Sequence, residues 1–434
     1  MNYKETINYL YAALPVFHRV GKAAYKANLD NTIVLDNYFG NPHKHYKTVH
    51  VAGTNGKGSV SHMIASVLQS ARLKTGLYTS PHLFDFRERI KINGKEISEK
   101  LVIDFVEKNK EIIEELKPSF FEITSSMAFQ LFSEEKADIA VIETGLGGRL
   151  DSTNIITPLI SVITNIGLDH TEFLGYELES IAAEKAGIIK PCIPVVIGEK
   201  HSETTDVFIN KASECNSPIY FAEECFEITS VEKWQDKQTF TIKTLNKELF
   251  SNDFTISVDL GGDYQKKNII TALTALAVIK KYIKVDNQHI FEGIANAAKN
   301  TALNGRWQVL KTSPFIICDT GHNAHGLQHT MQQLKHIEKD KLHVVLGVVN
   351  DKDLNSIIPL LPKEGYYYFT RASTPRSMDA EVLAEKCIAH GLKGEVVTPV
   401  EAAVQKAVEN AGSNDVVFIG GSTFVVADIP KNLF

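Results

Sequence analysis

A glycine-rich loop directly after an apolar run is the feature that most limits how this chain can fold. Residues 53–59 read Gly-Thr-Asn-Gly-Lys-Gly-Ser and follow the apolar residues 49–52. Glycines let backbone N–H groups converge on phosphate oxygens, Lys57 adds a positive charge, and the hydroxyl of Ser59 can reach a magnesium ion. Because residues 60–71 have helical spacing, the sequence predicts a strand, a phosphate-binding loop and a helix, in that order. The spacing departs from the common G-x-x-x-x-G-K-[ST] loop: it is shorter before the lysine and longer after it.

The composition is that of a globular protein and excludes several functional classes. The 434 residues are 44% hydrophobic and 23% charged, which allows two or three domains with cores of their own. A net charge of −6 argues against a nucleic-acid partner. The five cysteines form no C-x-x-C pair, residues 1–14 do not resemble a signal peptide, and no apolar run is long enough to span a membrane. We therefore expect a cytoplasmic protein without a membrane partner.

Apolar, β-branched runs alternate with stretches of helical spacing along most of the chain. Strands are expected at 48–52, 76–79, 139–142, 159–164, 194–197, 315–318, 343–348, 366–369, 395–397 and 416–419. Helices fit between most of them, for example at 98–116, 125–132 and 269–281. Such alternation predicts parallel sheets that are covered on both faces. Residues 220–258 contain segments in which apolar and polar residues alternate, which indicates a small antiparallel sheet.

A long helical stretch ends near residues 299–303, and a fresh α/β alternation begins soon after Trp307. We therefore expect two domains of the α/β class. Residues 1–300 would form an N-terminal P-loop-type ATPase domain with a parallel sheet. Residues 301–434 would form a smaller C-terminal Rossmann-like domain.

Polar residues directly after expected strands are the first candidates for chemistry, because ligands of open α/β sheets bind beyond the carboxyl ends of strands. Glu143 ends one strand and would suit a magnesium ion near the phosphate loop, although a surface carboxylate beside a turn fits the same pattern. His170 follows another strand, and Asp169 could orient its ring, but a lone histidine is more often structural. Ser80, after a third strand, could offer an oxygen to a metal or simply belong to a turn.

Lys185 lies at the end of an expected helix, where Gly187 suits the helix cap. Nothing in the local residue pattern gives this lysine a function. The residues alone predict a solvated side chain.

The C-terminal half has its own candidates around the strand at 315–318. Asp319 and His322 follow this strand, and Arg306 precedes it at the domain junction. An arginine facing a bound nucleotide can neutralise charge on a transferring phosphate, although a lone arginine is more often a surface residue. Residues 420–423 form either a further anion-binding turn or a plain loop.

Six segments in register resemble the folylpolyglutamate synthase/dihydrofolate synthase family of the Mur ligase superfamily, over nearly the whole chain. They are the phosphate loop at 50–59, a substrate loop at 78–83 with 88–90, the motifs ETGLGGRLDSTN at 143–154, NIGLDH at 165–170 and EKAGI at 184–188, and the C-terminal signature at 319–323. This signature is usually D-x-A-H-N. Gly321 stands where the family has alanine, while Asp319 and His322 are in place.

The resemblance implies a role for each matching residue. ATP would be bound by Thr54, Asn55, Gly56, Lys57, Gly58, Ser59, Asn268, Arg306 and Asp319. Two Mg²⁺ sites are implied, one at Ser80 and Glu143 with Ser59, and a second at His170. Lys185 would be carbamylated, which turns an ammonium into a carboxylate-like group that helps to seat the γ-phosphate. With Lys57 and Lys185, His322 would complete the catalytic residues by orienting glutamate or the intermediate.

The resemblance also implies where the pterin end of the acceptor lies. The implied residues are Phe120, Phe121, Glu122, Leu150, Asp151 and Ser152, together with Lys22 and Tyr25. Phe121 offers a ring for stacking, and Asp151 can accept hydrogen bonds from an aminopyrimidinone.

The implied reaction is ATP-dependent amide formation. The carboxylate of dihydropteroate, or the γ-carboxylate of a (tetrahydro)folate, would attack the γ-phosphate of ATP to give an acyl phosphate and ADP. The amine of L-glutamate would then displace phosphate. The protein would position small-molecule substrates as a monomer, with the two domains closing over them.

Three alternatives remain open at this point. A Mur ligase acting on a cell-wall precursor would share the chemistry and differ in the acceptor. A P-loop GTPase switch would need an N-K-x-D motif, whereas residues 350–353 read Asn-Asp-Lys-Asp. A nucleotide-binding scaffold without catalysis would not need the full set of candidate side chains.

Overall fold

A computed structural model describes residues 1–14, 28–234, 237–350, 352–430 and 433. The chain divides into two compact units. The N-terminal unit consists of Met1–Glu232, Thr239–Asp259 and Gln265–Leu303, and the C-terminal unit consists of Lys233–Gln238, Leu260–Tyr264 and Asn304–Phe434. The chain therefore passes from one unit to the other several times, and two of these passages follow Asp259 and Leu303.

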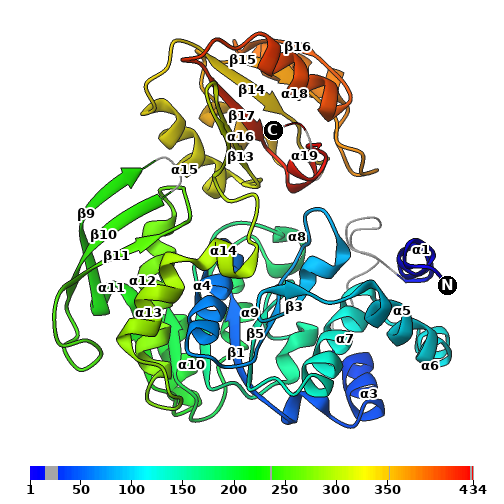
Figure 1. Cartoon of the computed structure of the whole chain (residues 1–434), viewed down its shortest axis with the longest axis vertical. Coiled ribbons are helices and arrows are strands. Elements are labelled where there is room, and N and C mark those ends of the chain that lie inside the picture. Colours follow the sequence, from blue (N-terminus) through cyan, green and yellow to red (C-terminus); the bar gives the residue numbers. More distant parts are fainter. Residues whose placement is uncertain (15–27, 235–236, 351, 431–432, 434) are drawn as a thin grey trace. The chain divides into compact units, whose positions relative to one another are not determined.

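The N-terminal unit is built on a largely parallel sheet, of which β1, β3 and β5 are labelled in Figure 1. Its described strands run in the order β4-β3-β2-β5-β1-β6-β7-β8. Their bounds are β1 Lys47–Ala52, β2 Thr75–Tyr78, β3 Ile90–Ile92, β4 Lys95–Glu96, β5 Ile139–Glu143, β6 Ile160–Ile163, β7 Val195–Ile197 and β8 Ile219–Phe221. Strands β2, β5, β1, β6, β7 and β8 pair in parallel with their neighbours in this order. At one edge, β3 pairs antiparallel with both β2 and β4 and so adds a hairpin. A separate three-stranded sheet has the order β11-β10-β9, with β9 Phe226–Trp234, β10 Lys237–Thr244 and β11 Phe254–Val258.

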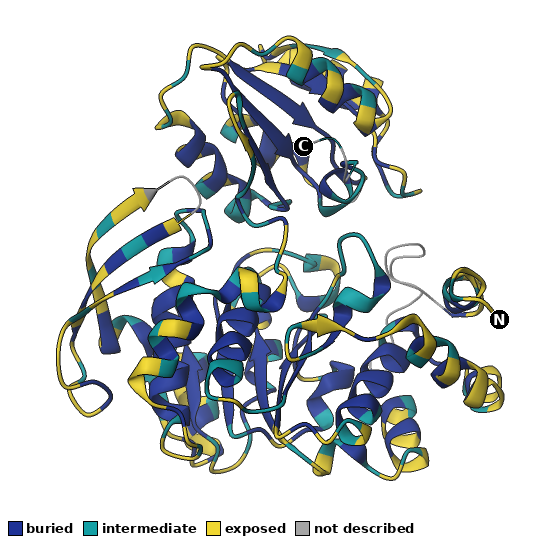
Figure 2. Ribbon diagram, in the orientation of Figure 1, coloured by how far each residue is buried: buried dark blue, intermediate teal, exposed yellow. Residues whose placement is uncertain are grey.

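Helices surround this sheet. Their bounds are α1 Tyr3–Ala13, α3 Asp30–Tyr38, α4 Lys57–Ser70, α5 Glu99–Lys108, α6 Lys110–Leu116, α7 Phe120–Glu134, α8 Thr171–Leu174, α9 Leu178–Ala186, α10 Thr205–Glu214, α11 Ala222–Cys225, α12 Gln265–Ile279, α13 Asn287–Ala295 and α14 Ala297–Thr301. Short 3-10 turns lie at Pro42–Lys44, Phe86–Arg89 and Ser152–Ile155. Helix α4 is packed among α12, α13 and α14, and almost every residue after its first turn is buried. The central strands are buried as well (Figure 2), as expected for a parallel sheet with covered faces.

The C-terminal unit is a second α/β sheet, with the order β12-β13-β17-β14-β15-β16. The strands are β12 Gln308–Thr312, β13 Phe315–Asp319, β14 Leu342–Leu346, β15 Tyr366–Phe369, β16 Lys393–Val396 and β17 Val416–Gly420. Only the pair β12 and β13 is antiparallel among these described strands. The helices are α15 Ala324–Lys335, α16 Leu354–Ile357, α17 Ala380–Ala389, α18 Val400–Glu409 and α19 Thr423–Ala427, with a 3-10 turn at Ile358–Leu360.

The predicted α/β fold class is confirmed, and each expected strand corresponds to an observed strand with shifts of one or two residues at the ends. One helix prediction is wrong. The stretch 98–116 forms two helices, because Asn109 leaves the helical conformation between α5 and α6. Its side-chain Nδ2 donates to the carbonyl of Phe105 at 2.8 Å, which offers the backbone an alternative to helix continuation. Within the described part of the chain, every helix is too short or too polar to cross a bilayer.

Candidate active site

The loop after β1 has a backbone that only glycine suits at two positions. Gly53 has φ +149°, and a Cβ there would lie 1.9 Å from the hydroxyl of Thr164. Gly56 has φ +83°, and a Cβ there would lie 2.2 Å from Oδ1 of Asn268. Gly56 is also the N-cap of α4. Because it has no side chain, it leaves the first-turn N–H groups of this helix available to an anion.

The segment after β6 holds the loop in place through a set of hydrogen bonds. Asn165 accepts from the backbone N–H of Thr54 through its carbonyl at 2.9 Å, and from that of Asn55 through Oδ1 at 2.8 Å. The hydroxyl of Thr164 donates to the carbonyl of Asn55 at 2.6 Å. The hydroxyl of Thr54 exchanges hydrogen bonds with the backbone of Gly167. The supporting role of Thr164 and Asn165 was not predicted, although their position just past a strand end was a signal.

Two lysines meet at the loop. The ammonium of Lys57 donates to the carbonyls of Gly53 and Thr54 at 2.9 and 3.1 Å, and that of Lys185 donates to the same Gly53 carbonyl at 2.9 Å. The side chain of Lys185 is fully enclosed. Burial lowers its pKa to about 7, and the positive charge of Lys57 acts in the same direction. A large fraction of Lys185 is therefore the neutral, nucleophilic amine near pH 7.

The residue-based prediction of a solvated Lys185 is wrong, because this residue lies in the last turn of α9 with its side chain buried. Gly187 is the C-cap of α9, as predicted, although its backbone conformation is right-handed rather than left-handed. A Cβ at Gly187 would lie 2.4 Å from Cα of Arg149, so close packing of two chain segments explains the glycine.

The candidate metal ligands in the N-terminal unit come from neighbouring strands. Glu143 ends β5 and pairs in register with Val51 of β1, just before the loop. The backbone N–H of Ser80 donates to Oε2 of Glu143 at 3.4 Å. The hydroxyl of Ser59 is buried in the first turn of α4 and accepts a hydrogen bond from Gln265 at 3.3 Å. In the same region, the Asn268 amide donates to Gln265 at 2.8 Å, which places this predicted ATP contact against the loop.

His170 follows β6 and has a left-handed backbone with φ +51°. Asp169 accepts a hydrogen bond from the backbone N–H of His170 at 2.9 Å, while its other oxygen lies 4.0 Å from Nε2 of the ring. The carboxylate therefore fixes the backbone of His170 at this point rather than bonding to Nε2. Across the described ranges, no three His, Cys, Asp or Glu residues gather in a group suited to a metal ion.

The two phenylalanines predicted to bind the acceptor differ in how much of their ring surface is exposed. The ring of Phe120 is buried between Tyr11, stacked at 5.2 Å, and the guanidinium of Arg89, 5.3 Å from the ring centroid. Phe121 is half-buried, and its ring lies directly against Gly145, where a Cβ would approach within 2.5 Å. Of the two rings, Phe121 is thus the one with exposed surface for stacking.

Asp151 is buried, and its carboxylate already has four protein donors. Oδ2 accepts from the N–H groups of Gly145 and Leu146, and Oδ1 accepts from the N–H and hydroxyl of Thr153. Burial raises the pKa of Asp151, and these hydrogen bonds oppose the rise. The four donors fill the usual capacity of a carboxylate, so an additional pterin contact would have to displace or share one of them.

Some of the remaining acceptor candidates make contacts within the protein itself or are buried. Glu122 forms a capping box with Ser119 at the start of α7. Ser152 is buried and Leu150 is half-buried beside Asp151. Lys22 and Tyr25 lie outside the described residues.

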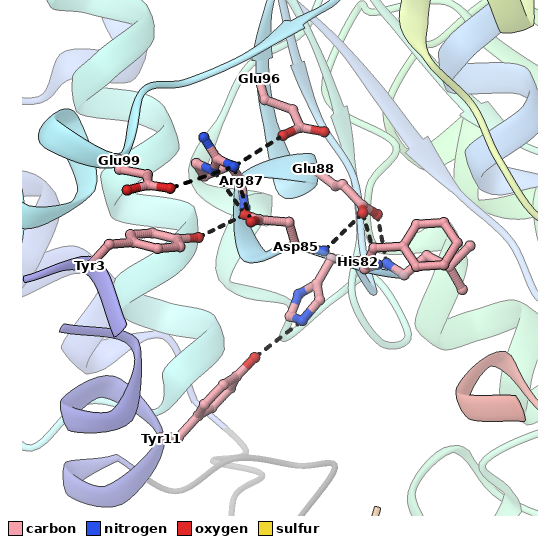
Figure 3. A network of polar contacts seen from close by, with 10 residues as sticks. Tyr3, Tyr11, His82, Asp85, Arg87, Glu88, Glu96 and Glu99 are labelled. Atoms are coloured by element: carbon pink, nitrogen blue, oxygen red, sulfur yellow. Dashed lines mark hydrogen bonds and ion pairs between the residues drawn. The ribbon is translucent and has the colours of Figure 1, made fainter. Parts of the chain in front are cut away.

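The loop that carries Ser80 is held by the N-terminal helix (Figure 3). The hydroxyl of Tyr3 donates to Asp85 at 2.7 Å, and the hydroxyl of Tyr11 lies 3.1 Å from Nε2 of His82. Nε of Arg89 donates to Nδ1 of His82 at 2.7 Å, so the ring proton of neutral His82 lies on Nε2, facing Tyr11. These contacts fix the shape of the loop beside Glu143.

The C-terminal unit brings Arg306, Asp319 and His322 together around Thr320. The guanidinium of Arg306 donates to the hydroxyl of Thr320. That hydroxyl donates to the carbonyl of Gly305 at 3.0 Å, and Nδ1 of His322 lies 3.1 Å from the carbonyl of Thr320. Three residues that are apart in the sequence therefore lie at one end of β13, as their positions beside the strand predicted.

Asp319 is buried at the end of β13 and is fully engaged. Oδ2 accepts from the backbone N–H of Trp307 and the hydroxyl of Tyr264, both at 2.7 Å, and Oδ1 accepts from the N–H of Gly321 at 2.7 Å. A Cβ at Gly321 would lie 2.9 Å from Oδ1, so an alanine here would shift the carboxylate. Sequence reasoning missed Tyr264, because it lies 55 positions before its partner in the chain.

The turn at residues 420–423 lies next to this cluster, since Gly420 of β17 pairs with Asp319 of β13. The hydroxyl of Ser422 caps α19 by accepting from the N–H of Phe424 at 3.2 Å. The choice between an anion-binding turn and a plain loop remains a prediction.

Two family descriptions match the chain. Residues 51–276 match the Mur ligase middle domain, and residues 305–423 match the Mur ligase glutamate ligase domain. The chain is 34% identical over 411 residues to the dihydrofolate synthase/folylpolyglutamate synthase of Bacillus subtilis, a match that covers 91% of this chain and 92% of that protein. It is 31% identical over 389 residues to the folylpolyglutamate synthase of Lacticaseibacillus casei, covering 87% of each.

The solved structures that are similar to this chain include proteins of the same kind as these relatives. The folylpolyglutamate synthase of Thermotoga maritima has a TM-score of 0.80 at 33% identity, with 98% of this chain and 95% of that chain covered. Escherichia coli FolC in complex with DHPP and ADP has a TM-score of 0.83 at 28% identity, with 98% and 96% covered. Other similar structures include the Mycobacterium tuberculosis folylpolyglutamate synthase complexed with ADP, at a TM-score of 0.84 and 26% identity, with 98% of this chain and 96% of that chain covered.

Proposed function

Because the chain belongs to the folylpolyglutamate synthase/dihydrofolate synthase family of Mur-type, ATP-dependent ligases, we propose that it adds L-glutamate both to dihydropteroate and to the γ-carboxylate of a (tetrahydro)folate. The acceptor carboxylate takes the γ-phosphoryl group of ATP, and ADP leaves. The amine of glutamate then attacks the acyl phosphate, and phosphate leaves. Carboxylates and amines do not condense unaided in water, so phosphorylation supplies the leaving group.

The observation that carries this proposal is the meeting of Lys57 and Lys185 on the carbonyl of Gly53. Lys57 can hold the β- and γ-phosphates of ATP by its charge while the N–H groups of α4 bind their oxygens, and Lys185 lies beside it as the residue that we propose to be carbamylated. Thr54, Asn55, Gly56, Gly58 and Ser59 complete this loop. Asn268 supports it from α12, and Arg306 and Asp319 supply the contacts of the C-terminal unit.

The donor set in the N-terminal unit fits Mg²⁺. This ion prefers oxygen ligands and is usually held by one or two carboxylates together with substrate phosphates, rather than by an all-protein cage. Glu143, Ser59 and Ser80 provide such oxygens, and no larger acidic or histidine group occurs in the described residues. We assign one ion to these residues and a second to His170. Bound there, the ions would neutralise charge on the phosphates.

Lys185 is suited to carbamylation, because the reaction with CO₂ requires a neutral amine and the pKa of Lys185 is lowered to about 7. A carbamate at this position would replace a positive charge beside Lys57 with a negative one. It would then pair with Lys57 and help to seat the γ-phosphate.

For the acceptor we keep Phe121 as the stacking residue, together with Leu150 and Ser152. Phe120, Glu122 and Asp151 shape this region mainly through their own protein contacts. His322 would orient glutamate or the tetrahedral intermediate from the C-terminal unit.

We further propose that the ligase works as a cytoplasmic monomer on small molecules alone, without a nucleic-acid partner. The division into residues 1–300 and 301–434 remains our proposal for its domains.

One experiment separates the acceptors. Incorporation of labelled L-glutamate would be measured with ATP and dihydropteroate, then with tetrahydrofolate, and finally with a UDP-muramoyl peptide. We expect turnover with the first two. Turnover of the muramoyl peptide alone would mean that the folate assignment is wrong, although the relatives do not favour that outcome.

A paired variant tests the loop. Lys57→Ala should lose glutamate incorporation with either folate acceptor, because the phosphates lose a direct positive charge. Lys47→Ala is the matched control, since Lys47 is an exposed lysine at the opposite end of β1. Full activity of Lys57→Ala would contradict the role given to the loop.

A further inference from the structure

The short helix α14 is the last element before the chain leaves the N-terminal unit. It spans Ala297–Thr301, and the unit ends two residues later at Leu303. The next residues, Asn304 onward, belong to the C-terminal unit and lead directly to Arg306. The position of α14 thus fixes the point from which the Arg306 segment starts.

A buried lysine from a distant strand holds the end of this helix. Lys91 lies on β3, and its side chain is only 2% exposed. Its ammonium donates to the carbonyl of Thr301 at 2.7 Å and to that of Ala302 at 3.0 Å. An ammonium is costly to bury unless it is hydrogen-bonded, and here it is bonded to the last carbonyls of α14.

Helix α4, which begins at the phosphate loop, contacts the side chain of Thr301 at the end of α14. Nδ1 of His62, on α4, lies 2.7 Å from the hydroxyl of Thr301. Because that hydroxyl donates to the carbonyl of Ala297, it accepts from His62. His62 lies one turn after Ser59, so a hydrogen bond links the helix that begins at the phosphate loop to the end of α14.

The start of α14 is tied to a second passage between the units. The carboxylate of Asp259 accepts from the N–H groups of Ala298 and Lys299, each at 2.9 Å. Asp259 is the last residue of the N-terminal unit before the chain crosses at Leu260. Two of the passages between the units are therefore anchored on one five-residue helix.

We propose that Lys91 is a positioning residue for the ligase reaction. By holding the end of α14, it fixes the base of the segment that carries Arg306 relative to the phosphate-loop helix. The proposal rests on the function proposed above for its effect on turnover, but its effect on α14 is independent of any substrate. Lys91 contacts backbone carbonyls of the chain itself, so its loss should reduce turnover without weakening nucleotide binding at the loop.

Lys91→Met tests this proposal with three measurements. We expect trypsin to cleave after Lys299 and Arg306 about tenfold faster than in the wild-type protein, because local unfolding of a loosened α14 makes the backbone near both residues accessible to the protease. We expect kcat for glutamate incorporation to fall by about 10- to 100-fold, as for a small misplacement of a reacting group. The Kd for ADP, measured by calorimetry, should change by less than about twofold.

Two controls separate positioning from general damage. Lys91→Arg retains a buried cation with several donors and should restore most of kcat. Lys95→Met, on the exposed strand of the same hairpin, should match the wild-type protein throughout. If Lys91→Met does not fold, Lys91→Gln carries the test, since its shorter, neutral amide keeps a polar group at this buried position and weakens the hold on the carbonyls of Thr301 and Ala302.

Several results would overturn the proposal. An unchanged trypsin rate in Lys91→Met would show that Lys91 does not hold α14, whether or not the acceptor assignment is correct. A loss of ADP binding that parallels the loss of kcat would place its effect in the nucleotide site. A wild-type protein that turns over neither folate acceptor would instead refute the proposed function and leave the trypsin result to decide the role of Lys91.

Discussion

The buried ammonium of Lys185 gives the most direct quantitative test of the site. The pKa of this residue falls from 10.5 to about 7 on folding. Between these values the unfolded chain binds more protons than the folded one, so the wild-type protein should become more stable as the pH rises through this window. Below pH 7 the destabilisation is fully present, and above about pH 10.5 it is gone.

The size of the effect follows from the two pKa values. Integration of the proton linkage gives a destabilisation of about 4 kcal/mol at pH 7 and about 1 kcal/mol at pH 9.5. Replacing Lys185 with Met keeps a side chain of similar length and removes the titration. The difference in free energy of unfolding between Lys185→Met and the wild-type protein should therefore shrink by about 3 kcal/mol between these pH values.

The assay is urea unfolding of both proteins from pH 7 to 9.5 in degassed, bicarbonate-free buffer. The exclusion of CO₂ matters, because a carbamate would consume the neutral amine. Lys47→Met is the control, and its exposed lysine should leave the pH dependence of the wild-type protein unchanged. Adding bicarbonate at pH 8 should raise the stability of the wild-type and Lys47→Met proteins but not that of Lys185→Met.

A constant difference between Lys185→Met and wild type across this pH range would refute the reasoning. It would mean that Lys185 titrates alike in both states, so that its amine is not predominantly neutral near pH 8. Carbamylation would then lack its chemical basis, whatever the activity of the variant.

Three further predictions concern other parts of the site. Gly145→Ala should raise the KM for the pteroate acceptor several-fold, because the new Cβ displaces the Phe121 ring. Gly412→Ala is the control, since its Cβ would meet no atom within 3.5 Å. Equal KM values for the two variants in steady-state kinetics would contradict the placement of that ring. Burial lowers the pKa of His50 to about 3. The wild-type protein should therefore lose about 2 kcal/mol of stability between pH 7.5 and 5, because the unfolded chain takes up a proton on His50 that the folded chain does not. Urea titrations of His50→Gln should show no such loss if His50 causes it. Asp319→Asn replaces one acceptor with a donor among three donors, so it should lower the free energy of unfolding by about 1–3 kcal/mol; an unchanged urea midpoint would argue against these hydrogen bonds.

Features that depend on the local backbone could be predicted from the sequence. The loop at 53–59 was recognisable because its glycines, lysine and hydroxyl stand between an apolar run and a helix. The strands were recognisable because those buried on both faces form continuous apolar runs. Glu143 and Ser80 in one unit, and Asp319 in the other, could be selected because ligands of open α/β sheets bind beyond the carboxyl ends of strands.

Features that depend on contacts between distant segments could not be predicted in this way. The sequence neighbours of Lys185 do not show that its side chain is buried, and only the carbonyl of Gly53, 132 positions earlier, shows what its ammonium contacts. The capacity of Asp151 is filled by loop N–H groups whose direction no local pattern indicates. Asn109 divides a helix through one side-chain hydrogen bond that competes with an otherwise continuous helical pattern.

The hold of α1 on the substrate loop has a consequence for synthesis of the chain. Tyr3 and Tyr11 are synthesised before their partners Asp85 and His82, which follow 82 and 71 positions later. At a translation rate of about 5–20 residues per second, the helix waits roughly 4–16 s before its contacts exist. An amphipathic helix that precedes its binding surface by seconds is a natural site for chaperone contact, and the substrate loop cannot reach its final shape until that helix returns.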